Sequence, residues 1–306
     1  MEFNRLLSQV ISDYGEPTKQ KVENNKSSTK IDVKKYNTIL NIDELNKWIK
    51  KIEKIGVVAV DTETNSLNPQ EANLVGVSLC YSPGIACYIP LEHATDNVLE
   101  KKIVLEKLKN ILEDKSIKKI GQNIKFDYII FLNNKIKLNS IEDTMLMSYV
   151  LDSGRHRHNM DNLSEIHLNH KTISYKEITG SGKSQISFDQ VPIKQATEYA
   201  AEDADVTFRL YNIFKERLHK EKLLKIYELF EKPMINLLAE MEIRGIKIDS
   251  KFLKELSKKF EDKIKKLEKN IFSLAAKKFN IGSTKQLGEI MYNELKISTL
   301  KKTKKG

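Results

Sequence analysis

The sequence predicts an α/β domain over residues 37–221, with a linker over 1–36 and a C-terminal α-helical hairpin within 222–306. Two observations predict this class. Strand-like apolar runs come early in the region and helical patterns follow them, an order typical of α/β and α+β domains. From about Glu231 the pattern changes to long charged helices with apolar residues every three or four positions.

The first elements are expected to be a linker, a helix and three strands. Residues 1–36 begin with a short amphipathic stretch and continue into a polar run typical of a linker. The spacing of apolar residues then predicts a helix over 43–54. Apolar runs predict strands over 56–64, 73–82 and 85–91, with a turn at Pro83-Gly84, which together would form an antiparallel meander.

Helices dominate the remainder of the domain. The apolar periodicity predicts a short strand over 117–122, a strand end passing into a helix over 141–151, and helices over 98–113, 123–134, 160–170 and 193–220. Residues 171–191, which contain Gly180 and Gly182, are expected to form loops.

The C-terminal part has one apolar helical face between Lys and Glu residues. Residues 251–279 carry this face. Its members are Leu253, Leu256, Phe260, Ile264, Leu267, Ile271 and Leu274. The spacing predicts one long helix of a hairpin or coiled coil, with a structural rather than a catalytic role.

The composition is that of a packed, basic protein. Hydrophobic residues make up 40% and charged residues 31%, which is ordinary for a globular domain. Lys and Arg number 52 against 42 Asp and Glu, giving a formal charge of +10. Such an excess suits a nucleic acid, because phosphate contacts release counterions. A genome rich in Lys, Asn and Ile codons would produce the same excess.

Cysteine usage and hydropathy argue against export. Cys80 and Cys87 have no metal-ligand spacing and imply no disulfide framework. No apolar run is long enough to span a membrane, and the first residues contain no signal-peptide core. We therefore expect a cytoplasmic, nucleoid-associated protein with no membrane partner.

Asp61 and Glu63 lie two positions apart at the end of the apolar strand over 56–64. Side chains at i and i+2 share one face of a strand, so both carboxylates project into the same space. This arrangement suits a hard cation. A pair of this kind on its own is also common among solvated surface acids.

Two further pairs repeat this convergence at helical spacing. Asn123 and Asp127 are four residues apart at the start of one predicted helix, and Tyr199 and Asp203 are four apart in another. Each pair should share a helical face, whereas Asp205 should point elsewhere. Taken singly, Asn123 is equally explained as a helix cap, and the second pair as part of an acidic helix surface.

Together the three segments predict a two-metal hydrolytic site. Carboxylates from one strand and two helices can hold two divalent ions about 4 Å apart. One ion would lower the pKa of a bound water, and the other would stabilise the leaving 3′ oxygen. Tyr199, with an ordinary pKa of about 10, is a poor base and is better suited to orient the attacking water.

The segments VDTETNSL, GQNIKFD and YAAEDADVT match, in order and spacing, the three exonuclease motifs of the proofreading domains of bacterial family A DNA polymerases (DNA polymerase I). The chain resembles the tyrosine-containing (DEDDy) branch of the DnaQ-like superfamily. The stretch RHRHNMDNLSEIHLNHKTISYKEITGSGK is similar to the segment between the second and third motifs. The resemblance extends over about residues 40–298 and implies an RNase H-like exonuclease fold with a central mixed sheet.

The resemblance also implies the chemistry of the site. Asp61, Glu63, Asp127 and Asp203 would bind two divalent ions, Mg²⁺ or Mn²⁺, with Zn²⁺ as an alternative at one position. Tyr199 would orient the attacking water. All four carboxylates and the tyrosine are present in this sequence.

The same resemblance implies residues that bind the substrate. Leu67 and Tyr175 would wedge and stack at the 3′-terminal bases. Gln122, Asn123 and Arg157 would contact the terminal nucleotide or its phosphates. The expected reaction is stepwise hydrolysis of single-stranded or frayed DNA 3′ ends to 5′-mononucleotides, with low sequence specificity.

Both ends of the sequence resemble junctions with other domains. FEKPMINLLAEMEIRGIKID and FNIGSTKQLGEIMYNELKI are similar to the thumb helices that open a polymerase domain, and MEFNRLL resembles the junction after a 5′-nuclease domain. We therefore expect polymerase and 5′-nuclease domains as partners outside this sequence, and no polymerase activity from these residues. The basic stretch 251–306, with lysine pairs at 301–302 and 304–305, is equally consistent with a duplex DNA clamp and with a solvated charged face.

Two alternative functions remain open. An RNase D-like exonuclease that processes RNA 3′ ends would use the same metal-binding motifs. A non-catalytic DNA-binding module that supports a polymerase supplied in trans would need no catalysis. The four intact carboxylates argue against the second alternative.

Overall fold

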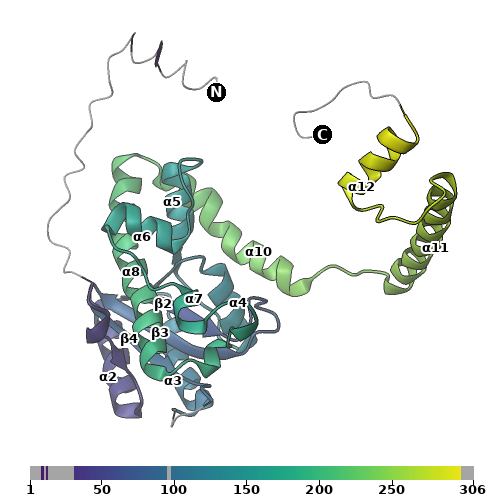
Figure 1. Ribbon diagram of the computed structural model, residues 1–306. Coiled ribbons are helices and arrows are strands. Elements are labelled where there is room, and N and C mark those ends of the chain that lie inside the picture. Colours follow the sequence, from purple (N-terminus) through teal and green to yellow (C-terminus); the bar gives the residue numbers. More distant parts are fainter. Residues whose placement is uncertain (1–7, 10–11, 13–30, 95–97, 298–306) are drawn as a thin grey trace. The chain divides into compact units, whose positions relative to one another are not determined.

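The computed structural model describes residues 8–9, 12, 31–94 and 98–297 (Figure 1). The chain divides into one unit that ends at Arg244 and another that begins at Gly245, and each is described by itself. Most of the predicted linker over 1–36 and the lysine pairs at 301–302 and 304–305 lie outside the described residues.

A mixed six-stranded sheet forms the centre of the first unit, as predicted. Its strands have the order β1-β4-β3-β2-β5-β6. They are β1 (Asn37–Thr38), β2 (Val57–Thr64), β3 (Leu74–Ser82), β4 (Ile85–Pro90), β5 (Lys118–Gly121) and β6 (Ile141–Asp143). β2, β3 and β4 form the predicted antiparallel meander, while β5 pairs in parallel with both β2 and β6, and β1 in parallel with β4.

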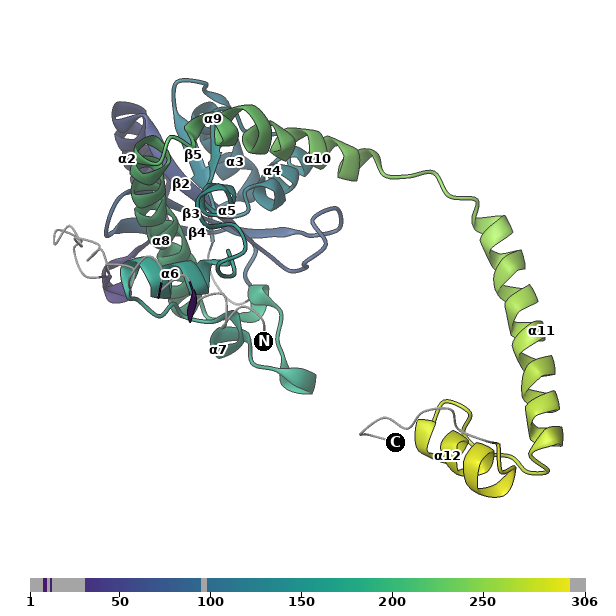
Figure 2. The same cartoon turned by 90° about the horizontal axis from the view of Figure 1, so that it is seen from above.

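Helices cover both faces of this sheet. They are α2 (Ile42–Ile55), α3 (Lys101–Glu113), α4 (Lys125–Asn133), α5 (Thr144–Asp152), α6 (Met160–Leu168), α7 (Tyr175–Thr179) and α8 (Ile193–Lys220). The core on one face contains α2, α3 and α4, and the core on the other contains α5, α6 and α8. Figures 1 and 2 show α8 running across the sheet.

The short helix α7 lies in the stretch 171–191, which the sequence predicted as loop. Ser174 and Glu177 form a reciprocal capping box at its start. Five residues are too few for apolar periodicity to be recognised, and for that reason the prediction missed this helix.

The side chains of β2 divide between the two faces of the sheet. Val58 and Val60 join the core that contains α2, α3 and α4, whereas Ala59 joins the core that contains α8. Because alternate residues of a strand share a face, Asp61 and Glu63 continue the α8 side and Thr62 continues the α4 side. The strand therefore directs its two acids towards one helix and the threonine between them towards another.

Residues 222–244 pack with the first unit, although the sequence predicts a change of domain after residue 221. The chain continues through α9 (Leu224–Ile226), the π-helical stretch η4 (Tyr227–Glu231) and α10 (Lys232–Arg244). Ile235 and Ala239 of α10 are buried in the core that contains α4. The structural division thus lies after Arg244, while the functional boundary at 221 stays a prediction.

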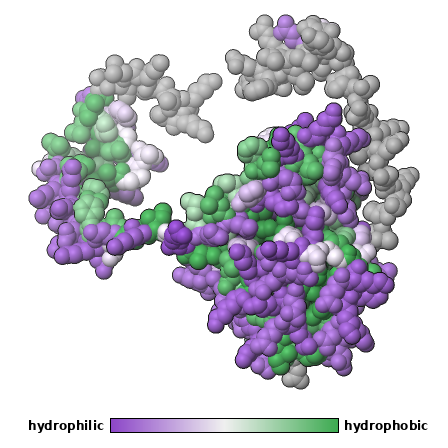
Figure 3. Space-filling model, turned by 180° about the vertical axis from the view of Figure 1, so that it is seen from behind, coloured by the Kyte–Doolittle hydropathy of each residue, from purple (hydrophilic) through white to green (hydrophobic). Residues whose placement is uncertain are grey.

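The second unit contains α11 (Ser250–Leu274), α12 (Thr284–Gly288) and the π-helical stretch η5 (Glu289–Glu294). α11 ends before residue 279, the predicted end, because the chain turns at Ala276, whose φ is 50°. No residue of α11 is buried, and Figure 3 shows hydrophobic and hydrophilic side chains exposed on this unit. Within the described residues of both units, no helix is long and apolar enough to cross a membrane.

Candidate active site

Three acidic side chains meet where β2 ends beside α8. Ligand oxygens of Asp61, Glu63 and Asp203 all lie within 4.8 Å of one another. Asp61 and Glu63 come from the α8-facing side of β2, and Asp203 comes from α8 itself. Ala200 and Ala204 of α8 are fully buried. Their small side chains let the helix approach the strand closely.

Asp127 reaches the same end of β2 from α4. Its Oδ1 accepts hydrogen bonds from the Thr62 amide at 2.9 Å and from the Thr62 hydroxyl at 2.6 Å. Thr62 lies between Asp61 and Glu63 but faces the opposite side of the sheet. Asp127 is therefore anchored beside the acidic group without being one of the three carboxylates within 4.8 Å of one another.

Glu63, Asp127 and Asp203 are buried and Asp61 is half-buried, and the four carboxylates have no protein counter-charge. Burial, together with repulsion by neighbouring acids, raises the pKa of each of them well above its usual range. Within the described part of the chain none of them pairs with Lys, Arg or His, and the buried Glu63 Oε1 has no hydrogen-bond partner. Mutually repelling oxygens of this kind are the donor set of a hard divalent cation. The site therefore suits divalent metal binding.

Tyr199 lies one helical turn before Asp203 on α8. Burial, and then the charges of Asp203 and Glu63, raise the pKa of Tyr199 well above its ordinary value. The phenol therefore keeps its proton. A protonated phenol can orient a water molecule by a hydrogen bond but cannot take a proton from it.

An aromatic group surrounds Tyr199. The ring of Phe188 lies 6.0 Å from that of Tyr199 and is nearly parallel to that of Tyr175, at 6.3 Å and 15°. Phe188 is buried, whereas Tyr175 is 37% exposed and presents part of its ring to solvent. Phe188 could not be predicted as part of the site, because it lies in a stretch of sequence without any periodic signal.

Tyr88 and Gly76 were also missed. Tyr88 of β4 is buried, and burial with the charges of Glu63 and Asp61 raises its pKa. Gly76 pairs with Glu63 across the β2–β3 ladder, and a Cβ at Gly76 would meet the Tyr88 hydroxyl at 2.1 Å. The glycine thus makes room for the ring beside the acids. A glycine inside a strand pattern is the one signal that could have suggested such a close approach.

The predicted substrate-binding residues differ in solvent exposure and in whether their polar groups already bond to the protein. Leu67 follows β2 and is 94% exposed, and Arg157 is also exposed. Gln122 is committed to the protein at both ends of its amide, because it donates to the His158 carbonyl at 2.8 Å and accepts from the Thr144 hydroxyl. Gln122 therefore joins the end of β5 to the segment that carries Arg157.

The prediction that Asn123 and Asp127 share one helical face is wrong. α4 begins at Lys125, and Asn123 lies outside it with a left-handed φ of 60°. The cause is Asp143, whose carboxylate accepts hydrogen bonds from the amides of Asn123 at 3.1 Å and Ile124 at 3.0 Å. Asn123 is exposed, and its contact with a nucleotide stays a prediction.

Asp205 points away from the acidic group, as predicted from the helical spacing. It is fully buried and accepts hydrogen bonds from the Tyr36 hydroxyl and the Gly84 amide, both at 2.8 Å. Arg209 completes its surroundings with an ion pair at 2.9 Å. Asp205 thus joins α8 to the turn between β3 and β4.

Known protein families match both parts of the chain. Residues 36–219 match the family described as 3′-5′ exonuclease, and residues 250–306 match DNA polymerase family A. The DNA polymerase I of Rhizobium leguminosarum is 43% identical over 291 residues, which are 89% of this chain and 29% of that protein. The chain therefore spans less than a third of the length of this curated relative.

Solved structures share the fold. The POL domain of Pol1 from M. smegmatis, in complex with DNA primer-template and dNTP, has a TM-score of 0.69 at 22% identity, over 88% of this chain and 43% of that one. Brucella melitensis NrnC with bound Mg²⁺ has a TM-score of 0.50 at 23% identity, over 69% of this chain and 92% of that one.

Proposed function

The chain belongs to the 3′-5′ exonuclease family that matches residues 36–219, and from this premise we propose that it hydrolyses single-stranded or frayed DNA 3′ ends to 5′-mononucleotides. The observation that carries the proposal is the group of carboxylates formed by Asp61, Glu63 and Asp203, with Asp127 anchored beside it. Buried acids that lack a protein cation suit the divalent ions that phosphodiester hydrolysis uses.

We propose that these four carboxylates hold two divalent ions, Mg²⁺ or Mn²⁺, with Zn²⁺ as an alternative at one position. The Glu63 Oε1 atom supports this, because it is buried, accepts no hydrogen bond within the described residues and is free to bind a cation. Brucella melitensis NrnC, a structural relative, has been solved with Mg²⁺. When bound, such ions lower the pKa of an attacking water and neutralise charge on the phosphate.

The side chains of the protein would bind and orient the substrate. Tyr199, still protonated, orients the attacking water. The exposed part of the Tyr175 ring stacks on the terminal base, and the exposed Leu67 wedges between bases. Arg157 attracts phosphate oxygens. None of these contacts reads a base edge, so sequence specificity should be low.

Residues 222–306 would belong to a polymerase part that continues outside this sequence. The match of residues 250–306 to DNA polymerase family A supports this, as does the relative named DNA polymerase I. The exonuclease would then act beside polymerase and 5′-nuclease domains, in the cytoplasm at the nucleoid. A mismatched primer end would be its preferred substrate, because a bad pair separates more easily than a correct one.

Digestion of a 5′-labelled DNA single strand by the 306-residue chain tests the proposal. With Mg²⁺ or Mn²⁺ the strand should shorten one nucleotide at a time from its 3′ end, and an RNA of the same sequence should be cut more slowly. Faster cleavage of RNA would instead indicate an RNA-processing exonuclease. DNA binding without any cleavage would indicate a non-catalytic module.

Thermal unfolding gives a second readout that does not depend on turnover. An ion present at 100 times its Kd stabilises the folded protein by about 2.7 kcal/mol, so Mg²⁺ should raise the melting temperature. An Asp203→Asn variant should lose most of this increase. An equal increase in the variant would show that Mg²⁺ binds elsewhere.

A further inference from the structure

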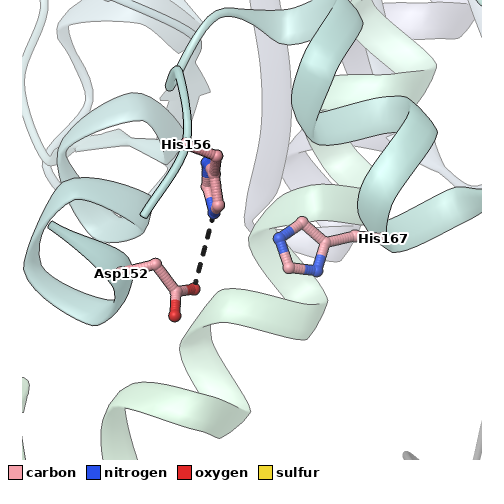
Figure 4. A group of neighbouring side chains, drawn as sticks. All are labelled: Asp152, His156 and His167. Atoms are coloured by element: carbon pink, nitrogen blue, oxygen red, sulfur yellow. Dashed lines mark ion pairs between the residues drawn. The ribbon is translucent and has the colours of Figure 1, made fainter. Parts of the chain in front are cut away.

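A second group of metal-ligand side chains lies between α5 and α6 (Figure 4). Asp152 is the last residue of α5, His156 follows in the next turn, and His167 belongs to α6. Their ligand atoms all lie within 4.8 Å of one another. None of the three belongs to the acidic group at the end of β2.

His156 presents a nitrogen lone pair to Asp152. Its Nδ1 lies 2.9 Å from the Arg157 carbonyl, which can only accept, so Nδ1 carries the proton and donates. In the neutral ring Nε2 is then an acceptor, and it faces Asp152 Oδ2 at 3.9 Å (dashed line in Figure 4). That separation is too long for a direct hydrogen bond. A cation between the two atoms would satisfy both.

His167 supplies a second nitrogen. Its Nε2 is buried and has no hydrogen-bond partner within the described residues, although buried polar atoms are nearly always paired. The ring packs edge to face on Phe214 of α8, with centroids 4.9 Å apart, which fixes its direction. In Figure 4 the His167 ring points towards His156 and Asp152.

Asp152 is held in place by two guanidinium groups, that of Arg217 on α8 and that of Arg155, whose Nη1 donates to Oδ1 at 3.0 Å. Arg217 Nη1 donates to Oδ2 at 2.6 Å, and Nη2 donates to Oδ1 at 3.2 Å. An ionised carboxylate oxygen has more than one acceptor position, so Oδ2 can bind a cation while Arg217 orients the group. Arg217 also forms an ion pair with Glu221, with its Nε 2.8 Å from Glu221 Oε1. Each of the three ligands therefore has a second contact that orients it, as metal ligands in proteins usually do.

We propose that Asp152, His156 and His167 form a binding site for a divalent transition-metal ion of the zinc class. Two imidazoles and one carboxylate are the ligand set of open Zn²⁺ sites, in which water takes the remaining position. The ion would join the end of α5 to α6 and so hold both ends of the segment that carries Arg157. The benefit of fixing Arg157 rests on the proposed function, whereas the binding site itself does not.

Titration of the full chain with Co²⁺ tests the site, because tetrahedral Co²⁺ with nitrogen ligands absorbs visible light far more strongly than octahedral Co²⁺ with oxygen ligands. The wild type should develop the strong absorption and saturate it with one ion per chain. Asp203→Asn, which disables the acidic group, should retain it. His219→Ala, a change at an exposed histidine of α8, should retain it as well.

His156→Ala and His167→Ala should abolish the strong absorption. Zn²⁺ affinity, measured by competition with a chelator, should fall by at least the roughly 10–100-fold that loss of an orienting partner causes. An unchanged absorption and affinity in both variants would overturn the proposal, as would a wild type without the absorption. Should His167→Ala fail to fold, His156→Ala, a change in a turn, decides the question by itself.

Discussion

Two carboxylates of α8, two residues apart, have opposite surroundings. Asp205 meets the guanidinium of Arg209, the hydroxyl of Tyr36 and the amide of Gly84. Asp203 meets two further carboxylates instead. Both side chains are buried, so the difference lies in charge and not in exposure. Asp205 therefore stabilises the fold. Asp203 has no positively charged protein partner, so its charge suits a bound cation.

The same contrast extends to other buried acids. Glu142 of β6 pairs with Lys118 at 2.9 Å and with Lys232 at 3.0 Å. Buried acids with protein cations of this kind hold elements together, and the acids at the end of β2 do not. A buried acid is therefore a better indicator of function when its neighbours fail to neutralise it.

The largest expected effect is the loss of activity in Asp203→Asn. Removing one carboxylate from the metal-binding group should reduce kcat on the order of 10³-fold, the size of losing a strong electrostatic contact in a transition state. Denaturant unfolding without metal should show no loss of stability, because the substitution removes repulsion. If the Asp203→Asn variant kept the wild-type kcat, or if it unfolded, the assignment of a catalytic role to Asp203 and a structural role to Asp205 would be contradicted.

Asp205→Asn, the matched control at the neighbouring aspartate, should act on stability instead. The substitution weakens a buried ion pair and two hydrogen bonds, so the free energy of unfolding should fall by about 3–5 kcal/mol. Urea titration measures this loss. The kcat per folded molecule should remain close to wild type. Equal losses of kcat at positions 203 and 205 would contradict the assignment of separate roles.

Tyr199→Phe should have a smaller effect on activity. The ring keeps its packing against Phe188, and only the hydroxyl that orients water is lost. We expect kcat to fall about 10-fold, less than the roughly 10²–10⁴-fold contribution of a general acid or base. Steady-state rates on single-stranded DNA measure this change. Complete loss of activity would instead give the tyrosine a direct part in proton transfer.

The last prediction concerns stability alone and involves Lys119 of β5, a buried cation whose partners are backbone carbonyls. Burial lowers its pKa from 10.5 to about 8. Between these values the unfolded chain binds more protons than the folded one, so stability should rise with pH. The stability of the wild type relative to Lys119→Met should increase by about 3 kcal/mol over this range. A difference between the two proteins that is independent of pH would contradict the lowered pKa.

Local patterns predicted the elements that carry the acids. The apolar runs predicted the β2–β4 meander, and the helical periodicity predicted the helix over 193–220 that the structure contains. The convergence of Asp61 and Glu63 followed from strand alternation alone. That Asp205 would point away from Asp203 followed from helical spacing.

Contacts between residues distant in sequence explain what the sequence could not predict. Asn123 leaves the helix because Asp143 binds its amide. Gln122 is occupied because Thr144 and the His158 carbonyl take both ends of its amide. Neither partner shows in the local pattern of residues around position 122. The structural role of Asp205 likewise depends on Tyr36, more than a hundred residues earlier.

The packing of α10 on α4 bears on how the nuclease would be produced by itself. α4 carries Asp127, and Glu242 of α10 forms an ion pair with Lys125 at the start of α4. A protein that ends at residue 219, where the family match ends, would expose the apolar surface beside α4 that Ile235 and Ala239 cover. Such a fragment would be prone to aggregate. A version that ends after Arg244 keeps this surface shielded and is the better choice for expression.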